Sequence, residues 1–178
     1  MNTHPTAAPV VVVIGVAGSG KSTVGTALAG RLGVVFADGD DFHPPVNVAK
    51  MAAGQPLDDI DRRPWLAAIG EWLDGRLAAG AGGVVACSGL RRAYRDQLRR
   101  SPEVHIVYLR ISLAEAKARA RARTGHYFTA DMVASQFVAL EEPDPAEGVL
   151  TVDATLDIAH LVEFIAEQIT GTAGQPPA

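Results

Sequence analysis

Residues 10–23, VVVVIGVAGSGKST, constrain the fold more than any other part of the chain because a buried strand runs directly into a glycine-rich loop. Residues 10–14 are β-branched without alternation, which is typical of a strand covered on both faces in a parallel sheet. Residues 15–22 have the spacing G-x-x-x-x-G-K-S, which lets backbone N–H groups converge on phosphate oxygens. The stretch therefore predicts an α/β fold that binds a nucleoside triphosphate.

The loop also supplies the predicted nucleotide and metal contacts. Residues 21–32 show helical spacing, so the helix N-terminus would point at the same phosphates. Lys21 adds a positive charge, and the Ser22 hydroxyl is a hard oxygen ligand suited to Mg²⁺. A glycine-rich turn without a ligand is the alternative, and the strand, loop and helix context argues against it. The predicted ATP-binding residues in this stretch are Gly15, Val16, Ala17, Gly18, Ser19, Gly20, Lys21, Ser22 and Thr23.

Length and composition favour a single domain of ordinary size. The 178 residues are 48% hydrophobic, enough for a single core, with residues 1–9 and 171–178 expected as flexible tails. A single cysteine, Cys87, excludes an internal disulfide and fits a cytoplasmic location. The first residues lack the basic region of a secretory signal, and residues 10–16 are too short to span a membrane. A net charge of -4 argues against nucleic-acid binding.

Strand and helix patterns alternate along the whole chain. Strands are predicted at 10–14, 34–37, 84–87, 104–110 and 149–152. Helices are predicted at 21–32, 47–53, 65–79, 91–100, 113–123, 130–140 and from 158 onward, with Pro64 early in the third. This order predicts a doubly wound, parallel, five-stranded sheet flanked by helices, with ligands beyond the carboxyl ends of the strands. The break at 124–129 suggests a mobile lid at about 119–142.

Two carboxylates follow the second predicted strand. Asp38 and Asp40 flank Gly39, and in an extended segment their side chains leave on the same face. We assign Asp38 to the magnesium side and Asp40 to the hydroxyl of a phosphoryl acceptor. A solvated D-G turn is the alternative interpretation, and the position after a strand favours the functional one.

Basic residues gather in groups with different expected tasks. Arg91 and Arg95 are four apart on a predicted helix, which suits recognition of a carboxylate. Arg119 and Arg123 are also four apart in the predicted lid, where they could close over the triphosphate. An arginine on a helix is often only a solvated residue, and this alternative stays open for each of them.

Further candidates lie in polar segments. Lys50 and Arg62 form another basic group, and Lys50 could contribute to binding an anionic substrate. His43 and His126 occupy polar loops, where exposure would let them bond to a polyol or a phosphate, or have no role.

Several motifs together resemble one family. The segments GVAGSGKST, DGDDFHPPVNVAKMAAGQPLDDIDRRPWL, CSGLRRAYRDQLR, RARTGHYF and SQFVALEEP resemble the gluconokinase family of phosphate-loop kinases, over about residues 10–170. The resemblance implies transfer of the ATP γ-phosphoryl group to the C6 hydroxyl of D-gluconate, with Mg²⁺, on an adenylate-kinase-like core that often forms a homodimer. Gly89 and Arg91 depart from the alanine and lysine that this family commonly shows.

The residues matched to these motifs complete the predicted site. The predicted catalytic residues are Lys21, Asp38, Asp40 and Arg123, with Ser22 and Asp38 as metal ligands and Arg119 and Arg123 as further ATP contacts. The predicted substrate-binding residues are Asp40, His43, Lys50, Arg62, Arg91, Arg95 and His126. A shikimate-kinase-like enzyme, a nucleoside-monophosphate kinase and a nucleotide-binding module without turnover are the alternatives.

Overall fold

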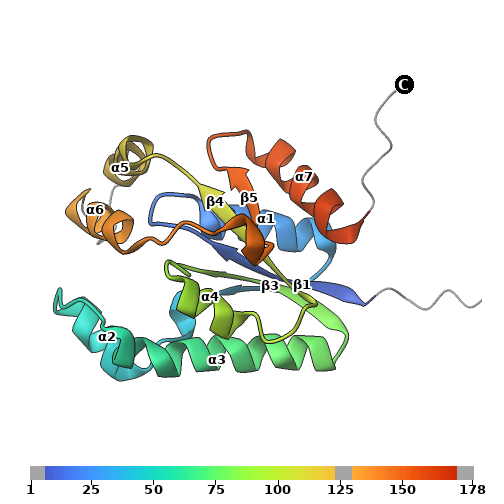
Figure 1. The fold of residues 1–178 in the computed structure, drawn as a ribbon, viewed down its shortest axis with the longest axis horizontal. Helices are drawn as coiled ribbons and strands as arrows, with labels where there is room; N and C mark the ends of the chain where they lie inside the picture. Colours follow the sequence, from blue (N-terminus) through green and yellow to red (C-terminus); the bar gives the residue numbers. More distant parts are fainter. Residues whose placement is uncertain (1–6, 123–129, 172–178) are drawn as a thin grey trace, which may run out of the picture.

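Five parallel strands form the central sheet of the computed structural model, which describes residues 7–122 and 130–171 (Figure 1). The strand order is β2-β3-β1-β4-β5, so the chain crosses over between neighbours and winds in two directions from β1. The bounds are β1 Ala8–Ile14, β2 Phe36–Asp38, β3 Ala81–Cys87, β4 Val104–Arg110 and β5 Leu150–Asp153. The predicted doubly wound, parallel, five-stranded sheet is confirmed.

Helices cover both faces of this sheet. Figure 1 shows α1 and α7 on one side and α3 and α4 on the other. The helices are α1 Lys21–Leu32, α2 Pro45–Ala52, α3 Asp59–Ala78, α4 Arg92–Leu98, α5 Leu113–Ala122, α6 Ala130–Ala139 and α7 Ile158–Thr170, with short 3₁₀ helices η1 Gly39–Phe42 and η2 Pro145–Glu147.

The valine run of β1 explains why the sheet needs two helical layers. Val11 and Val13 face a cluster that includes the buried side chains of α1 and α7. Val10 and Val12 face a second cluster, built with α3 and α4. Successive side chains of a strand point to opposite faces, so a run without polar residues is stable only between two apolar layers.

Most predicted bounds agree with the structure, and the start of α3 does not. We expected this helix to begin near Pro64, but it begins at Asp59, with Pro64 inside it. Asp58 accepts a hydrogen bond from the Asp61 N–H at 2.8 Å, and the Asp61 side chain accepts one from the Asp58 N–H at 3.2 Å. This reciprocal cap satisfies N-terminal donors and starts the helix earlier.

The other differences are small. β1 begins at Ala8, inside the predicted tail, and β2 is shifted to Phe36–Asp38. α1 and β4 have the predicted bounds. Helix α4 begins at Arg92 and leaves Arg91 as its N-cap.

The described parts of the predicted lid pack against the core. Val133 of α6 is fully buried, and Ala120 of α5 packs against the same core cluster. The mobility of residues 119–142 stays a prediction, and Arg123 and His126 lie outside the described residues. Within residues 7–122 and 130–171, no helix combines the length and apolar character needed to cross a membrane.

Candidate active site

The loop between β1 and α1 has the open, glycine-dependent path of a phosphate cradle. Gly18 and Gly20 have φ of 83° and 92°, a region that L side chains rarely adopt. A Cβ on Gly18 would also lie 2.8 Å from the Ala116 carbonyl oxygen of α5. Lys21 folds back over the loop, and its Nζ donates to the Val16 carbonyl at 3.0 Å. The loop can therefore present N–H groups and one ammonium group to an anion.

Two oxygen ligands for a cation meet beside this loop. Ser22 Oγ donates to Asp38 Oδ2 at 3.1 Å, which joins the start of α1 to the end of β2. In the part of the chain that the structure describes, no cluster of three or more His, Cys, Asp or Glu side chains could cage a metal. A hydroxyl and one carboxylate fit Mg²⁺, because this ion takes few protein ligands and keeps waters and phosphate oxygens. Ser22 and Asp38 could therefore hold it.

Asp40 follows in a turn that is fixed from two sides. Its N–H donates to Asp38 Oδ1 at 3.1 Å, and Trp65 Nε1 donates to the Gly39 carbonyl at 2.6 Å. A Cβ on Gly39 would lie 2.4 Å from the Ala86 carbonyl oxygen, so glycine lets the turn approach β3. The Asp40 side chain is 81% exposed, yet desolvation by the surrounding protein, and then the Asp38 charge, raise its pKa. An accessible carboxylate of raised pKa can accept a hydrogen bond from an alcohol.

His43 has an environment that its polar sequence neighbours do not indicate. Its side chain is 5% exposed and stacks on Trp65, with ring centroids 4.5 Å apart. Burial, and then the Arg62 charge, lower the pKa of His43 to about 4, so the ring is neutral near pH 7. Its Nε2 lies 3.9 Å from Asp40 Oδ1. The expectation of an exposed histidine is wrong, because the covering ring comes from α3.

A pocket with a volume of about 210 Å³ lies near the start of α3 and the loop before α4, and we call it the acceptor pocket. Its lining residues are Leu57, Asp58, Asp59, Arg62, Leu90, Arg91, Tyr94 and Ala139.

Charged and aromatic side chains converge in the acceptor pocket. Arg91 Nη1 lies 3.1 Å from both Asp59 carboxylate oxygens, and the Tyr94 hydroxyl donates to the same carboxylate. The Arg62 guanidinium lies 5.7 Å from the centroid of the Tyr94 ring. The Tyr94 hydrogen bond is the main cause that lowers the pKa of Asp59. Two guanidinium groups and a phenol can here bind a carboxylate.

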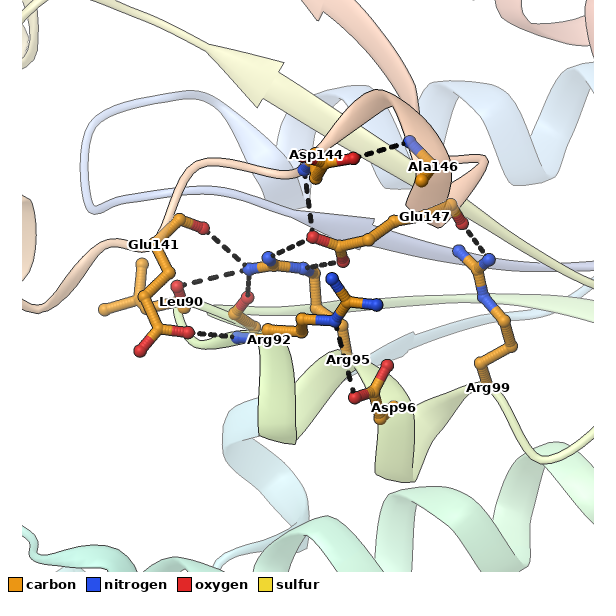
Figure 2. Close-up of polar contacts among 10 residues, drawn as sticks. Leu90, Arg92, Arg95, Asp96, Arg99, Glu141, Asp144, Ala146 and Glu147 are labelled. Atoms are coloured by element: carbon orange, nitrogen blue, oxygen red, sulfur yellow. Dashed lines mark hydrogen bonds and ion pairs between the residues drawn. The ribbon is translucent and has the colours of Figure 1, made fainter.

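Two predicted substrate contacts have other partners in this structure. Lys50 Nζ pairs with both oxygens of Asp61, at 2.7 and 2.8 Å. Arg95 is 1% exposed, and its Nε and Nη2 donate to the two Glu147 oxygens at 2.8 and 2.9 Å (Figure 2). Arg91 is extended, with φ -104° and ψ 149°, so it and Arg95 do not share a helical face. Spacing by four brings side chains together only when both residues are helical.

Two side chains from the predicted lid region reach the phosphate loop. Arg119 Nη1 lies 3.5 Å from the Gly18 carbonyl oxygen, and its Nη2 donates to the Ala154 carbonyl at 2.8 Å. Gln136 of α6 accepts a hydrogen bond from the Ala17 N–H at 2.6 Å.

Sequence reasoning missed Asp59, Tyr94 and Gln136 as site residues. All three lie in segments that carry the family resemblance, so those segments held a signal. Each of these side chains pairs with a residue far away in the chain, so no short sequence pattern indicates the pairing.

A larger hollow of about 680 Å³ lies elsewhere. Residues 99–102, the start of β4, residues 148–150 and the end of α7 line it. These segments surround the amino ends of β4 and β5, at the opposite end of the sheet from the phosphate loop. Ligands of doubly wound sheets gather at the carboxyl ends, so we place the site at the loop and the acceptor pocket.

Known proteins are similar to this chain in sequence and in fold. Residues 10–142 match the family described as AAA domain. The chain is 47% identical over 143 residues to a gluconokinase of Gluconobacter oxydans, covering 80% of each chain. It is 38% identical over 162 residues to the thermoresistant gluconokinase of Escherichia coli, covering 90% of this chain and 93% of that one. A crystal structure of a gluconokinase from Sinorhizobium meliloti superposes with a TM-score of 0.80 at 38% identity, covering 94% of this chain and 99% of that one. The chain belongs to the gluconokinase family.

Proposed function

We propose that this protein transfers the γ-phosphoryl group of ATP to the C6 hydroxyl of D-gluconate, giving 6-phospho-D-gluconate and ADP. The observation that carries the proposal is the pairing of a phosphate loop with an arginine-lined pocket at one end of the sheet. The loop follows β1, Asp38 ends β2, and Arg91 follows β3, and these strands are neighbours in the order β2-β3-β1. Relatives named gluconokinase, at 38% and 47% identity, support the choice of acceptor.

On the ATP side of the mechanism, the binding groups are backbone N–H groups and positively charged side chains. Loop N–H groups and Lys21 hold the triphosphate, and Arg119 lies close enough to add a second cation. Ser22 and Asp38 are the residues that would hold Mg²⁺. When bound, this ion supplies charge neutralisation on the phosphate oxygens.

On the acceptor side, different protein groups bind the two ends of an extended sugar acid. The substrate carboxylate binds Arg91, Arg62 and Tyr94, and the opposite end presents its hydroxyl to Asp40. Asp40 orients that hydroxyl and accepts its proton as the oxygen bonds to phosphorus.

The remaining predicted contacts lie around this path. Neutral His43 offers a ring nitrogen beside Asp40 for a substrate hydroxyl. We keep the catalytic role and the ATP contact of Arg123, and the substrate contact of His126, as predictions from the sequence. Lys50 supports α3 through Asp61, and Arg95 supports the loop that carries Arg91.

A panel of acceptors tests the proposal. The purified protein is mixed with MgATP and, separately, D-gluconate, related sugar acids, shikimate and nucleoside monophosphates. We expect ADP release to depend on gluconate, with ³¹P NMR placing the new phosphate at C6. Phosphorylation of shikimate instead would support a shikimate-kinase-like enzyme. Nucleotide binding without transfer to any acceptor would support a binding module.

We also propose a cytoplasmic location and a homodimer. The location is supported by the buried free thiol of Cys87, because a reducing compartment keeps such a thiol reduced. The dimer is supported by the family resemblance, and sedimentation of the purified protein tests it.

A further inference from the structure

Helix α6 contacts the phosphate loop through one side chain. Gln136 Oε1 accepts the Ala17 N–H at 2.6 Å, across a sequence separation of 119 residues. A backbone N–H can only donate, so the oxygen of the Gln136 amide must face the loop. The nitrogen of that amide keeps two N–H groups for other partners.

The chain leaving α6 is fixed to the acceptor pocket. Glu141 N–H donates to the Leu90 carbonyl at 2.8 Å, and Glu141 Oε2 accepts the Arg92 N–H at 2.8 Å (Figure 2). These two contacts are made to the residues on either side of Arg91. Ala139, the last residue of α6, lines the pocket itself.

A buried ion pair makes this second attachment rigid. Arg95 Nη1 donates to the carbonyl oxygens of Leu90 and Glu141, at 3.2 and 2.9 Å. Glu147 neutralises Arg95 and also accepts the Asp144 N–H at 2.9 Å. Figure 2 shows these groups converging on one guanidinium from three separate segments. A charge buried with its hydrogen bonds satisfied holds such segments in one arrangement.

The two attachments differ in strength. Several bonds and a buried charge fix the pocket end of α6, whereas the polar contact of α6 to the phosphate loop, in the part of the chain that the structure describes, is the Gln136 hydrogen bond. The side of α6 that includes Val133 is buried in the core. Helix α6 thus contacts both parts of the site, and Gln136 makes its polar contact at the phosphate end.

We propose that α6 sets the separation of the phosphate loop and the acceptor pocket, and that Gln136 is the positioning residue at the phosphate end. This inference rests on the proposed function. Phosphoryl transfer needs the acceptor oxygen in line with the γ-phosphorus, and a displacement of about 1 Å can cost about 10²-fold in rate. A misplaced alcohol also leaves room for water to take the phosphoryl group.

The test measures how closely ATP consumption is coupled to gluconate phosphorylation, as well as the rate of the reaction. Gln136→Met keeps the length of the side chain and removes the acceptor for Ala17. We expect kcat with gluconate to fall about tenfold or more, with KM for gluconate and MgATP within about twofold. The ratio of ADP formed to phosphogluconate formed should rise above one, because water competes. A role confined to stability would not change this ratio.

Gln168→Met is the matched control. Gln168 is an exposed glutamine of α7 that lines the hollow at the opposite end of the sheet. We expect this variant to keep the parental kcat and a ratio of one. If Gln136→Met does not fold, Gln136→Asn keeps the amide on a side chain one methylene shorter and should also raise the ratio.

Each outcome bears on the inference. An unchanged ratio in a folded Gln136 variant, with an active parent, overturns the positioning role and leaves the proposed function intact. A parent that forms no phosphogluconate overturns both. Faster hydrogen exchange of the Ala17 amide in Gln136→Met, but not in Gln168→Met, would support the contact independently of activity.

Discussion

The two halves of the site are built in different ways. The phosphate half is one continuous segment, residues 15–23, whose binding groups are mainly backbone N–H groups held by glycine conformations. The acceptor half gathers side chains from α3, from the loop before α4 and from the end of α6. Its charges are already paired, with Arg91 bound to Asp59.

The difference teaches what each half must do when a ligand arrives. Backbone donors lose little on binding, because the chain has already fixed their directions. In the proposed mechanism, in contrast, Arg91 is paired with Asp59 and must share or exchange that carboxylate for the carboxylate of the substrate. We therefore expect changes in the acceptor half to alter affinity for the acceptor, while the phosphate half keeps its affinity for nucleotide.

The largest effect is expected where the halves meet, at Asp40. Asp40→Asn should lower kcat by about 10³-fold, because the amide no longer accepts the hydroxyl proton. Nucleotide affinity should stay within about twofold, because the loop donors are unchanged. Coupled ADP release and a fluorescence titration with a nucleotide analogue measure the two quantities.

Asp41 gives the matched control for this change. Asp41 lies in the same turn and is exposed, so Asp41→Asn makes the same chemical change one residue away. We expect near-parental turnover. Full activity of Asp40→Asn would remove Asp40 from catalysis and move the junction of the two halves elsewhere.

The next effect concerns the support beneath the acceptor half. Glu147→Gln should lower the free energy of unfolding by about 3 kcal/mol near pH 7, because it leaves the buried Arg95 charge without its partner. Asp74→Asn breaks the exposed Arg100–Asp74 pair, whose atoms lie 2.8 Å apart, and should cost less than about 1 kcal/mol. Urea unfolding measures both.

The pH dependence of the unfolding free energy distinguishes a contribution of this ion pair from a contribution of packing. Hydrogen bonding to Arg95 lowers the pKa of Glu147 to about 2, below its ordinary value of 4.5. A carboxyl with a lowered native pKa stabilises the fold above its unfolded pKa, and this contribution is lost as the pH falls toward the native pKa. The gap between parent and Glu147→Gln should therefore shrink from pH 5 to pH 3. A constant gap would contradict the ion-pair account.

Arg91 tests the separation of the two halves directly. Arg91→Ala should raise KM for gluconate about tenfold to thirtyfold, because one charged hydrogen-bonding group is lost, and leave KM for MgATP unchanged. Arg92→Ala is the control and should leave both KM values unchanged, since Arg92 is exposed and its Nε lies 3.8 Å from Asp96 Oδ2. A parallel rise in both KM values for Arg91→Ala would show that the halves do not act separately.

Local sequence patterns account for most of the fold and for the phosphate half. The valine run, the glycine spacing and the helical period each lie within one segment, so α1 and β4 have their predicted bounds. The start of α3 differs from the prediction because Pro64 is typical of the first turn of a helix, whereas the cap formed by Asp58 and Asp61 starts this helix at Asp59.

The acceptor half depends on contacts between distant segments. His43 was expected to be exposed, and its stacking partner Trp65 comes from α3. Arg95 was grouped with Arg91 by spacing, and the extended conformation of Arg91 separates them. Glu147, which neutralises Arg95, lies 52 residues further along the chain. No period or motif encodes such pairs.

The smallest effect compares two glycines. Gly89 has φ +53°, and a Cβ there would lie 2.5 Å from Ile14 Cγ2. Gly89→Ala should cost about 1 kcal/mol or more in unfolding free energy. Gly30 of α1 has no atom within 4 Å of the added Cβ, so Gly30→Ala should stabilise by about 0.5–1 kcal/mol. Urea unfolding of both variants shows whether each substitution lowers or raises the free energy of unfolding.

The position of Gly89 makes this comparison informative for the site. Gly89 lies between Ser88, which accepts the Gly15 N–H at 3.2 Å, and Leu90, which lines the acceptor pocket. A strained alanine should therefore also raise KM for gluconate, by a factor smaller than that of Arg91→Ala. If Gly89→Ala is as stable as the parent, the loop has a second path that accommodates a Cβ. The acceptor half would then be adaptable in its backbone as well as in its charge pairs, whereas the positive φ of Gly18 and Gly20 and the close approach of Gly18 to Ala116 require glycine in the phosphate half.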